Sequence, residues 1–304
     1  MNETVLLLGG GGFIGSHVAA AATAGGYRVR VFDRQVSPWV TLPSTAEVVI
    51  GDCADSMALR AALAGCMGVV QLISSSVPGD ASPLGREVRD NVLPTLDLLD
   101  LLPETGVRSI VFASSGGTVY GDHGPAPITE GERLAPRCSH GVGKTVVEQC
   151  LAFHARTTGA AVTILRPSNP YGPGQSPMGR QGVIPIFMRK VSLGEEITLF
   201  DNPVRDYVYV EDLAAAFVQA VGASGGLRVL NAGTGQGTSL ESLVGLIESV
   251  VGRRARVARR DQRGCDVAAN ILATDGIRRT LGWRPQVDLA TGLARTWSWL
   301  QGTL

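Results

Sequence analysis

Short apolar runs alternate with amphipathic segments over the first half of this chain. Apolar runs bounded by glycine, proline or polar residues are typical of buried strands. Such runs occur at 4–8, 27–32, 46–50, 68–73, 107–113 and 161–165. Apolar residues at helical spacing predict helices between them, near 13–25, 56–64, 85–102 and 139–158. Because strands that alternate with helices form βαβ units, we expect a parallel sheet.

The helix predicted at 139–158 carries an apolar stripe. Val142, Val146, Cys150 and Phe153 recur near helical spacing. We expect this stripe to form the face of the helix that packs against the sheet.

The pattern changes after Arg166. Proline and glycine interrupt the stretch 167–174 so often that we expect no regular structure there. Later elements are shorter, with helices predicted near 180–193, 211–223, 239–251 and 289–301 and brief strands between them. We therefore predict two domains, the first from 1–166 with 205–234 returning to it, the second from 167–204 and 235–304. A ligand would bind between them, beyond the carboxyl ends of the strands.

Three glycines follow the first predicted strand at the spacing of a dinucleotide-binding loop. Gly9, Gly12 and Gly15 would let the chain turn off the strand, let a pyrophosphate approach the backbone, and let helix and strand pack closely. Asp33 ends the second predicted strand, near the roughly 20-residue spacing of a carboxylate that binds ribose. These features predict an α/β protein with a Rossmann-type doubly wound parallel sheet, a smaller C-terminal substrate-binding domain, and NAD as cofactor. The alternative is a structural turn with a solvated Asp33.

Composition narrows the class of protein. Hydrophobic residues make up 44% and charged residues 18% of the 304 positions, and the net charge is zero. We therefore expect a globular chain that binds neither nucleic acid nor a membrane surface. The five cysteines are scattered without metal-ligand spacing, which predicts no metal site and suits a reducing compartment. With neither a signal peptide nor a membrane-spanning apolar run in view, we expect a cytoplasmic protein.

Several segments, in order along the chain, resemble one family. They include the glycine loop, a Ser-Ser-Gly-Gly-Thr-Val-Tyr-Gly motif and an Arg-Pro-Ser-Asn-Pro-Tyr-Gly motif, and they lie at 9–15, 51–52, 91, 114–121, 166–175, 205–212, 231–235 and 281–285. Together they resemble the extended short-chain dehydrogenase/reductases. Within that group they are most similar to the NAD-dependent nucleotide-sugar epimerases and dehydratases, in particular the UDP-glucose 4-epimerases. The resemblance covers essentially the whole chain.

The resemblance implies a tightly bound NAD and a set of residues that hold it. These are Gly9, Gly12, Phe13, Ile14, Gly15, Asp33, Arg34, Asp52, Cys53, Ser74, Ser75, Asn91, Lys144 and Pro167. In this family a tyrosine removes a proton from a sugar hydroxyl, and a lysine four residues later lowers the pKa of that tyrosine. The lysine is Lys144. A serine or threonine that hydrogen-bonds the same hydroxyl would fall at Gly116, so this role passes to Ser115 or Thr118.

Where the family has its tyrosine, this chain has His140, one helical turn before Lys144. Three interpretations are open. In the first, His140 is the catalytic base, because an imidazole with a pKa of about 6.5 can accept a proton near neutral pH. In the second, another residue or the substrate supplies the base, and His140 serves only as a positioning residue. In the third, the protein binds NAD and a sugar nucleotide with little or no redox activity.

The residues before Val119-Tyr120-Gly121 favour one reaction. Family members that eliminate water carry an Asp-Glu pair there, and this chain has Gly117 and Thr118. Since neither can act as the acid or base of an elimination, we expect a 4-epimerase that works through a transient 4-keto sugar. A nucleotide-sugar oxidoreductase or ketoreductase on the same scaffold is the enzyme alternative.

The resemblance also implies a site for the sugar nucleotide. It assigns this role to Ser115, Asn169, Val183, Phe200, Arg205, Arg263 and Asp266. The two arginines would clamp the diphosphate, or else form surface salt bridges with Asp206 and Asp266. A UDP-sugar is favoured over a dTDP-sugar. The family further implies a homodimer formed through the helices near 85–102 and 139–158.

Overall fold

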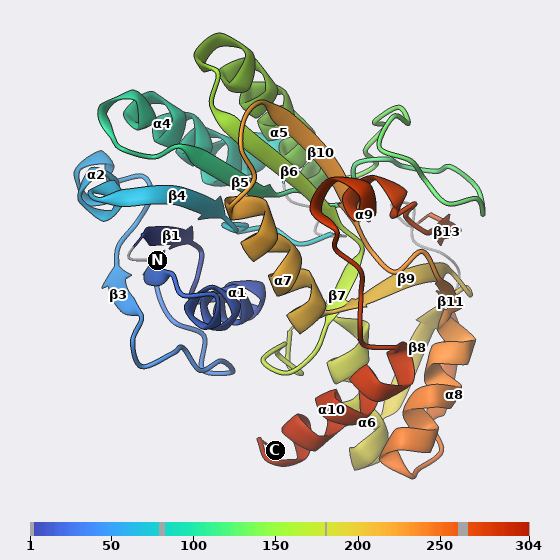
Figure 1. Ribbon diagram of the computed structural model, residues 1–304. Coiled ribbons are helices and arrows are strands. Elements are labelled where there is room, and N and C mark those ends of the chain that lie inside the picture. The colour runs from blue at the N-terminus through green and yellow to red at the C-terminus, as the bar shows by residue number, and fades with distance from the viewer. Residues whose placement is uncertain (1–2, 79–82, 180, 261–266, 304) are drawn as a thin grey trace.

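The computed structural model describes residues 3–78, 83–179, 181–260 and 267–303. At its centre is a seven-stranded sheet in the order β10-β6-β5-β4-β1-β2-β3 (Figure 1). Every neighbouring pair in this sheet is parallel. Its strands are β1 (Thr4–Leu8), β2 (Arg28–Asp33), β3 (Glu47–Ile50), β4 (Cys66–Gln71), β5 (Ser109–Ala113), β6 (Ala161–Pro167) and β10 (Leu227–Ala232). The predicted Rossmann-type sheet is confirmed, and β10 is one of the brief strands expected between the later helices.

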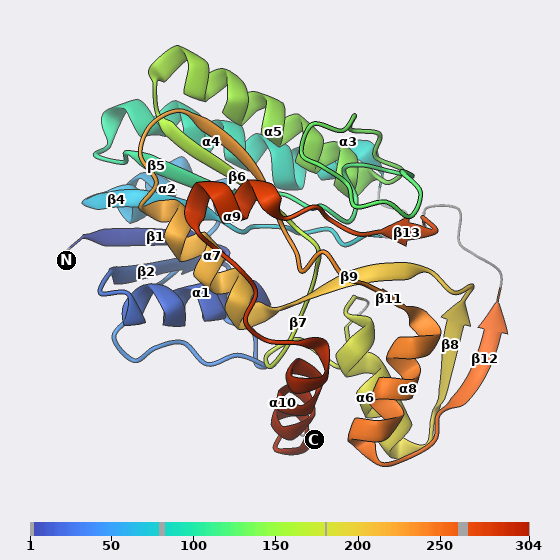
Figure 2. The ribbon, with the colours of Figure 1, turned by 45° about the vertical axis from the view of Figure 1, so that its right-hand side comes forward.

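Successive side chains of β1 point to opposite faces of the sheet, and those from Val5 to Leu8 are apolar, so both faces must be covered. Val5 and Leu7 belong to one core and Leu6 and Leu8 to the other, and all four are buried. The two faces are covered by α1 (Phe13–Ala24) and α7 (Val210–Val221) on one side, and by α2 (Ser56–Leu63), α4 (Leu93–Leu101) and α5 (Ser139–Thr158) on the other (Figures 1 and 2). A parallel sheet covered on both faces needs nearly continuous apolar strands, which is the signal that the sequence carried.

The helix predicted at 85–102 is divided into pieces. A short helix α3 (Leu84–Glu87) leads into a π-helical segment, Val88–Val92, before α4 begins, and a 3₁₀ turn (Leu102–Glu104) follows α4. Pro94 lacks the amide hydrogen that would pair with the carbonyl of Asp90, which accounts for the widened turn. Such turns are frequent at functional sites, and this one carries Asn91.

The prediction that the stripe with Val146 and Phe153 forms the buried face of α5 is wrong. Val146 and Phe153 are 39% and 62% exposed. The residues of α5 that are buried are His140, Gly141, Gly143, Lys144, Val147, Glu148, Leu151 and Ala155. Three of them are polar or charged, so hydropathy placed the buried stripe on the wrong side of the helix. The contacts described below explain why these polar residues face inwards.

A smaller region lies below the large sheet in the view of Figure 2. Its strands are β7 (Asn169–Tyr171), β9 (Val204–Tyr209), β11 (Gly237–Ser239) and β13 (Ala269–Asn270) in one sheet, and β8 (Glu196–Phe200) with β12 (Arg256–Arg260) in another. Helices α6 (Val183–Leu193), α8 (Leu240–Val251) and α10 (Leu289–Gln301) share a core with them. The expectation of no regular structure at 167–174 is wrong for β7. Pro170 is compatible with that strand because, among the described residues, β7 pairs with β9 alone.

The helix α9 (Asp275–Leu281), which the sequence did not predict, packs against the core beside α7.

The boundaries of the two predicted domains stay a prediction. Across the residues that the structure describes, none of the helices is both long and apolar enough to cross a membrane.

Candidate active site

A cavity of about 900 Å³ lies where the carboxyl ends of the large-sheet strands meet the smaller region. Parallel strands bring such ends to one edge of the sheet, so residues distant in sequence meet there. The predicted site residues that line it are Gly9, Gly12, Phe13, Ile14, Gly15, Asp33, Arg34, Asp52, Cys53, Ser74, Ser75, Ser115, Thr118, His140, Lys144, Pro167, Asn169, Val183, Phe200 and Arg205. Arg263 and Asp266 lie outside the described residues.

The glycine loop at the start of α1 fits a dinucleotide. A Cβ on Gly15 would lie 2.5 Å from the carbonyl oxygen of Gly9, and Gly9 itself has a φ of +81°. These two glycines are therefore required by the backbone. A Cβ on Gly12 would meet only the Gly9 oxygen, at 3.6 Å, so Gly12 keeps its space open towards the cavity. No side chain caps the start of α1, which leaves the N–H groups of its first turn available for a pyrophosphate.

Asp33 is held at the end of β2 by backbone donors. Its carboxylate accepts hydrogen bonds from the N–H of Gly11 at 3.0 Å and of Arg34 at 2.7 Å. This arrangement fixes the carboxylate beside the glycine loop, where a ribose hydroxyl of a dinucleotide would be recognised. Asp52 and Cys53 line the same end of the cavity. Burial raises the pKa of Cys53 to about 12, so that side chain is a neutral thiol.

His140 lies in the first turn of α5, where the helix meets the cavity. Its Nδ1 is 2.9 Å from the hydroxyl of Ser76, which follows β4 and also lines the cavity. Burial and, to a smaller extent, the nearby Lys144 ammonium lower the pKa of His140 to about 3, so the imidazole is neutral at pH 7. Asn91, predicted to contact the cofactor, does not line the cavity, because its amide is occupied by Ser75 and Ser76 behind the wall.

Lys144 points from α5 to the end of β5. Its ammonium donates a hydrogen bond to the carbonyl oxygen of Ala113 at 2.7 Å. Burial lowers the pKa of Lys144 to about 8, and the carboxylates of Glu87 and Glu148 oppose this shift. Glu87, which the sequence analysis missed, is 1% exposed, and neither of its oxygens has a hydrogen-bond partner among the described residues. Its carboxyl group occupies the space that a side chain at position 143 would fill, so Gly143 makes room for it.

The loop after β5 leaves no room for a serine at position 116. A Cβ on Gly116 would lie 2.5 Å from a methyl group of Leu272 and 2.9 Å from the carbonyl oxygen of Pro167. By contrast, a Cβ on Gly117 would meet only Asn169, at 3.9 Å, and this glycine lines the cavity. The Thr118 hydroxyl is buried without a partner among the described residues, and together with Ser115 it supplies hydroxyl groups at this edge.

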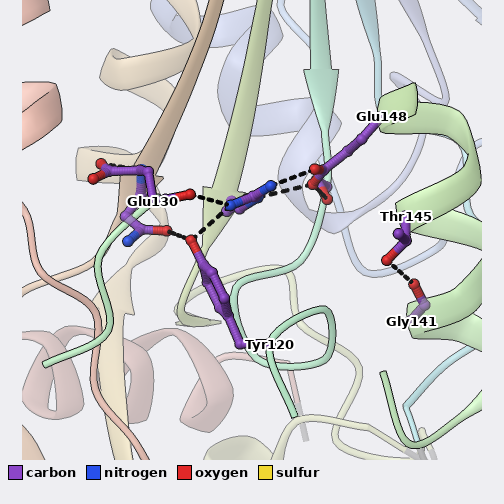
Figure 3. Close-up of polar contacts among 8 residues, drawn as sticks. Tyr120, Glu130, Gly141, Thr145 and Glu148 are labelled. Atoms are coloured by element: carbon purple, nitrogen blue, oxygen red, sulfur yellow. Dashed lines mark hydrogen bonds and ion pairs between the residues drawn. The ribbon is translucent and has the colours of Figure 1, made fainter. Parts of the chain in front are cut away.

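A buried polar network supports this loop from behind (Figure 3). Arg166 on β6 forms an ion pair with Glu148 of α5 at 2.5 Å, and both are at most 5% exposed. Arg166 also donates to the Tyr120 hydroxyl at 2.9 Å, which in turn donates to Asn231 at 2.6 Å. The Ser114 hydroxyl donates to Glu148 as well. This network explains why Glu148 faces inwards on α5.

Among the described residues, no tyrosine near the site is placed to act as a catalytic base. Tyr120 is committed to Arg166 and Asn231 and does not line the cavity, and burial raises its pKa. Tyr171 and Tyr207 line the cavity from the smaller region. Burial raises the pKa of both, that of Tyr207 to about 12, which disfavours a phenolate.

The far end of the cavity carries the predicted substrate residues. The Asn169 amide donates to the carbonyl oxygen of Asp206 at 2.9 Å, which fixes its orientation at the end of β6. The Asp206 carboxylate is fully buried and accepts hydrogen bonds from Thr234 and from the N–H of Gly235. Arg205 lines the cavity, and its guanidinium donates to the Val204 carbonyl at 3.0 Å.

Sequence reasoning missed Ser76 and Glu87. Ser76 is the third residue of the run Ser74-Ser75-Ser76 after β4, so polarity at a strand end was a signal that could have found it. Glu87 gave no such signal, because nothing in a single sequence shows that a helical glutamate is buried.

Comparisons with known proteins show the family to which this chain belongs. A model of the NAD dependent epimerase/dehydratase family matches residues 5–233. A putative UDP-glucose 4-epimerase of Methanocaldococcus jannaschii is 32% identical over 302 residues, which covers 98% of each chain. A dTDP-4-dehydro-6-deoxyglucose reductase of Escherichia coli is 34% identical over 228 residues, covering 74% of this chain and 72% of the reductase. The crystal structure of UDP-glucose 4-epimerase from Thermotoga maritima with UDP-glucose superposes with a TM-score of 0.93, at 32% identity over 99% of each chain.

Proposed function

Because this chain belongs to the NAD dependent epimerase/dehydratase family, we propose that it is a nucleotide-sugar 4-epimerase working through a transient 4-keto sugar. Its cofactor is NAD, which the glycine loop and Asp33 fit. The observation that carries the proposal is the lining of one cavity. The dinucleotide loop, the pair His140 and Lys144, and the predicted sugar-nucleotide residues occur together in it.

The roles of the side chains follow from their chemistry. NAD, when bound, would supply the acceptor and then the donor of a hydride at one sugar carbon. His140 exchanges a proton with the oxygen on that carbon, taking it up during oxidation and giving it back during reduction. The Lys144 ammonium, fixed by Ala113, contributes positive charge that favours the oxyanion form of that oxygen. Ser115 or Thr118 hydrogen-bonds the same oxygen.

The residues beside Tyr120 support epimerisation over elimination. An elimination of water needs an acid and a base at the positions of Gly117 and Thr118, and these side chains supply neither. Epimerisation at C4 needs only one carbon to be oxidised, the ketone to turn over in the cavity, and reduction on the other face. The cofactor residues and the predicted substrate residues line one cavity of about 900 Å³, so both ligands would meet in it.

We infer that the substrate is a UDP-sugar, with a dTDP-sugar as the second choice. The support is similarity: the relative from Thermotoga maritima was solved with UDP-glucose. The relative from Escherichia coli is a reductase of a dTDP-keto sugar, and it favours a second candidate function, a nucleotide-sugar ketoreductase. A reductase would need to donate a proton to a ketone without first removing one from a hydroxyl.

We further infer a homodimer formed through α4 and α5. These helices cover the face of the sheet opposite α1 and α7 (Figure 1). On them, Leu93, Val146 and Phe153 are 45%, 39% and 62% exposed. Large exposed apolar residues grouped on neighbouring helices mark interaction surfaces. Light scattering of the protein and of a Phe153→Glu variant tests this: a dimer that becomes a monomer is expected, and a monomeric parent protein contradicts the inference.

The deciding experiment is an NMR assay of the NAD-loaded protein with UDP-hexoses, UDP-N-acetylhexosamines, UDP-uronic acids and a dTDP-4-keto sugar. A new anomeric signal from a C4 epimer is the expected result, and it should be lost in His140→Phe. Reduction of the keto sugar alone would favour the ketoreductase. Binding by saturation transfer without any product would favour a binding protein with little redox activity.

A further inference from the structure

The imidazole of His140 has a hydroxyl partner on the loop that follows β4. The Ser76 hydroxyl lies 2.9 Å from Nδ1, and the two side chains are 7% and 6% exposed. Ser76 also lines the cavity. Nε2 has no hydrogen-bond partner among the described residues, so it is the ring nitrogen available to a ligand in the cavity.

The direction of the Ser76–His140 hydrogen bond follows from Asn91. The Asn91 Oδ1 accepts hydrogen bonds from the N–H of Ser75 at 2.8 Å and from the Ser75 hydroxyl at 3.2 Å. A backbone N–H can only donate, so this amide atom must be the oxygen, which settles the orientation of the amide. The Asn91 Nδ2 therefore faces Ser76 and donates to its hydroxyl oxygen at 3.4 Å.

The Ser76 hydrogen is then left to be donated. Among the described residues, the acceptor within reach of it is His140 Nδ1. An Nδ1 that accepts carries no hydrogen, so the neutral ring holds its hydrogen on Nε2. Since burial lowers the pKa of His140 to about 3, the resting ring is neutral and takes one of two tautomers.

We propose that Ser76 is a positioning residue that fixes the resting hydrogen of His140 on Nε2, facing the sugar oxygen. This deepens the proposed function and rests on it. In the resting tautomer, Nε2–H can donate to a carbonyl oxygen, as a neutral imidazole does when it polarises a ketone. In the other tautomer the Ser76 hydroxyl turns and accepts from Nδ1–H, which leaves on Nε2 the lone pair that proton removal needs. Uptake of the sugar proton on Nε2 in that tautomer gives an imidazolium, whose Nδ1–H is then held by the Ser76 hydroxyl oxygen until Nε2 returns its proton to the sugar oxygen.

The direct test is NMR of protein labelled with ¹⁵N-histidine, with His140→Phe used to assign the signal of His140 among the four histidines. At pH 7 we expect a protonated Nε2 and an unprotonated Nδ1. In Ser76→Ala we expect a mixture of tautomers or the opposite one, and in Ser76→Thr, which keeps the hydroxyl, the original pattern. A protonated Nδ1 in the parent protein, or an unchanged signal in Ser76→Ala, would overturn the proposal.

The kinetic test uses a matched control. Ser76→Ala should lower kcat at least tenfold and change KM by less than about threefold, and Ser76→Thr should recover most of kcat. Ser109→Ala removes an equally buried serine hydroxyl, 5% exposed, at the opposite end of β5. It should alter neither kcat nor the His140 signals; an equal loss in this control would mean that Ser76 is merely structural.

The two proposals fail in different ways. If no sugar nucleotide is converted, the proposed function fails while the NMR signals still decide the role of Ser76. If an epimer is formed but Ser76→Ala leaves kcat and the His140 tautomer unchanged, the proposed function stands and the role of Ser76 is wrong.

Discussion

The cofactor end and the catalytic end of the cavity are held in place by different means. At the cofactor end the backbone decides which residues fit, since a Cβ on Gly15 would overlap the carbonyl of Gly9 and the Asp33 carboxylate is fixed by two backbone N–H groups. At the catalytic end, side chains hold one another: His140 contacts Ser76, and Glu87 fills the space beside Gly143.

The difference supports our proposal that His140 takes the role of the family's tyrosine. A backbone-determined loop tolerates few substitutions, because each added atom meets main chain. A site built from side chains can exchange one group for another if its support is kept. Here the support consists of Lys144 on the Ala113 carbonyl and the Arg166–Glu148 pair beneath the loop, and the group that we propose to be exchanged is His140.

The largest expected effect comes from breaking that support. Arg166→Met would leave the Glu148 carboxylate buried without its partner, at 3% exposure. Because an uncompensated buried charge is costly, we expect the free energy of unfolding to fall by about 3–5 kcal/mol. Urea denaturation at pH 7 measures this loss.

The matched control is a surface pair. Arg278→Met removes an arginine that is 49% exposed and bonded to Asp275 three residues before it, and it should change stability by less than about 0.5 kcal/mol. The double variant Arg166→Met/Glu148→Met should recover most of the loss, since apolar residues can replace a buried pair. Equal losses in the single and double variants would contradict the assigned role of the ion pair.

A second test sharpens the comparison by placing a serine on each glycine of the catalytic loop. Gly116→Ser would force a side chain against Leu272 and the carbonyl oxygen of Pro167, and we expect a loss of up to about 3 kcal/mol from overpacking. Gly117→Ser adds a side chain towards the cavity and should change stability by less than about 0.5 kcal/mol. Thermal unfolding of both variants decides; equal losses would mean that this loop is no more open at 117 than at 116.

The same contrast governs what the sequence could predict. Strands such as β1 and the glycine loop were predictable because burial on both faces and the need for a bare backbone leave direct traces in residue type. The inward face of α5 was not, because Lys144 and Glu148 are buried for their partners and not for their hydropathy. The contact of His140 with Ser76 joins α5 to the loop after β4, and no local pattern records such a meeting.

The third prediction concerns pH. His140 has a pKa of about 3 in the folded protein, lowered by burial and then by Lys144, against about 6.5 in the unfolded chain. Between these values the unfolded state binds more protons, so stability falls as pH drops below 6.5 and the loss levels off below about pH 3. The slope from this group is about 1.4 kcal/mol per pH unit, or about 2 kcal/mol by pH 5.

Urea denaturation at pH 7, 6 and 5 measures the slope. His140→Phe should remove this part of it, whereas His154→Gln, which changes a half-buried histidine on the same helix, should leave most of it in place. A parent protein whose stability is the same at pH 7 and pH 5 would show that His140 is not buried as a neutral ring.

The smallest expected effect is the weaker binding of NAD when the Asp33 carboxylate is removed from the cofactor end. Asp33→Ala should weaken NAD binding by about tenfold, or about 1.4 kcal/mol, and should narrow the preference for NAD over NADP, because the carboxylate that repels a 2′-phosphate is gone. Asp55→Ala is the control: Asp55 also accepts two backbone hydrogen bonds, at the start of α2, but does not line the cavity. Calorimetric titration of both variants should show weaker NAD binding for Asp33→Ala alone. If the two variants bind NAD equally well, Asp33 serves the turn and not the ribose, and the cofactor end then depends on its backbone alone.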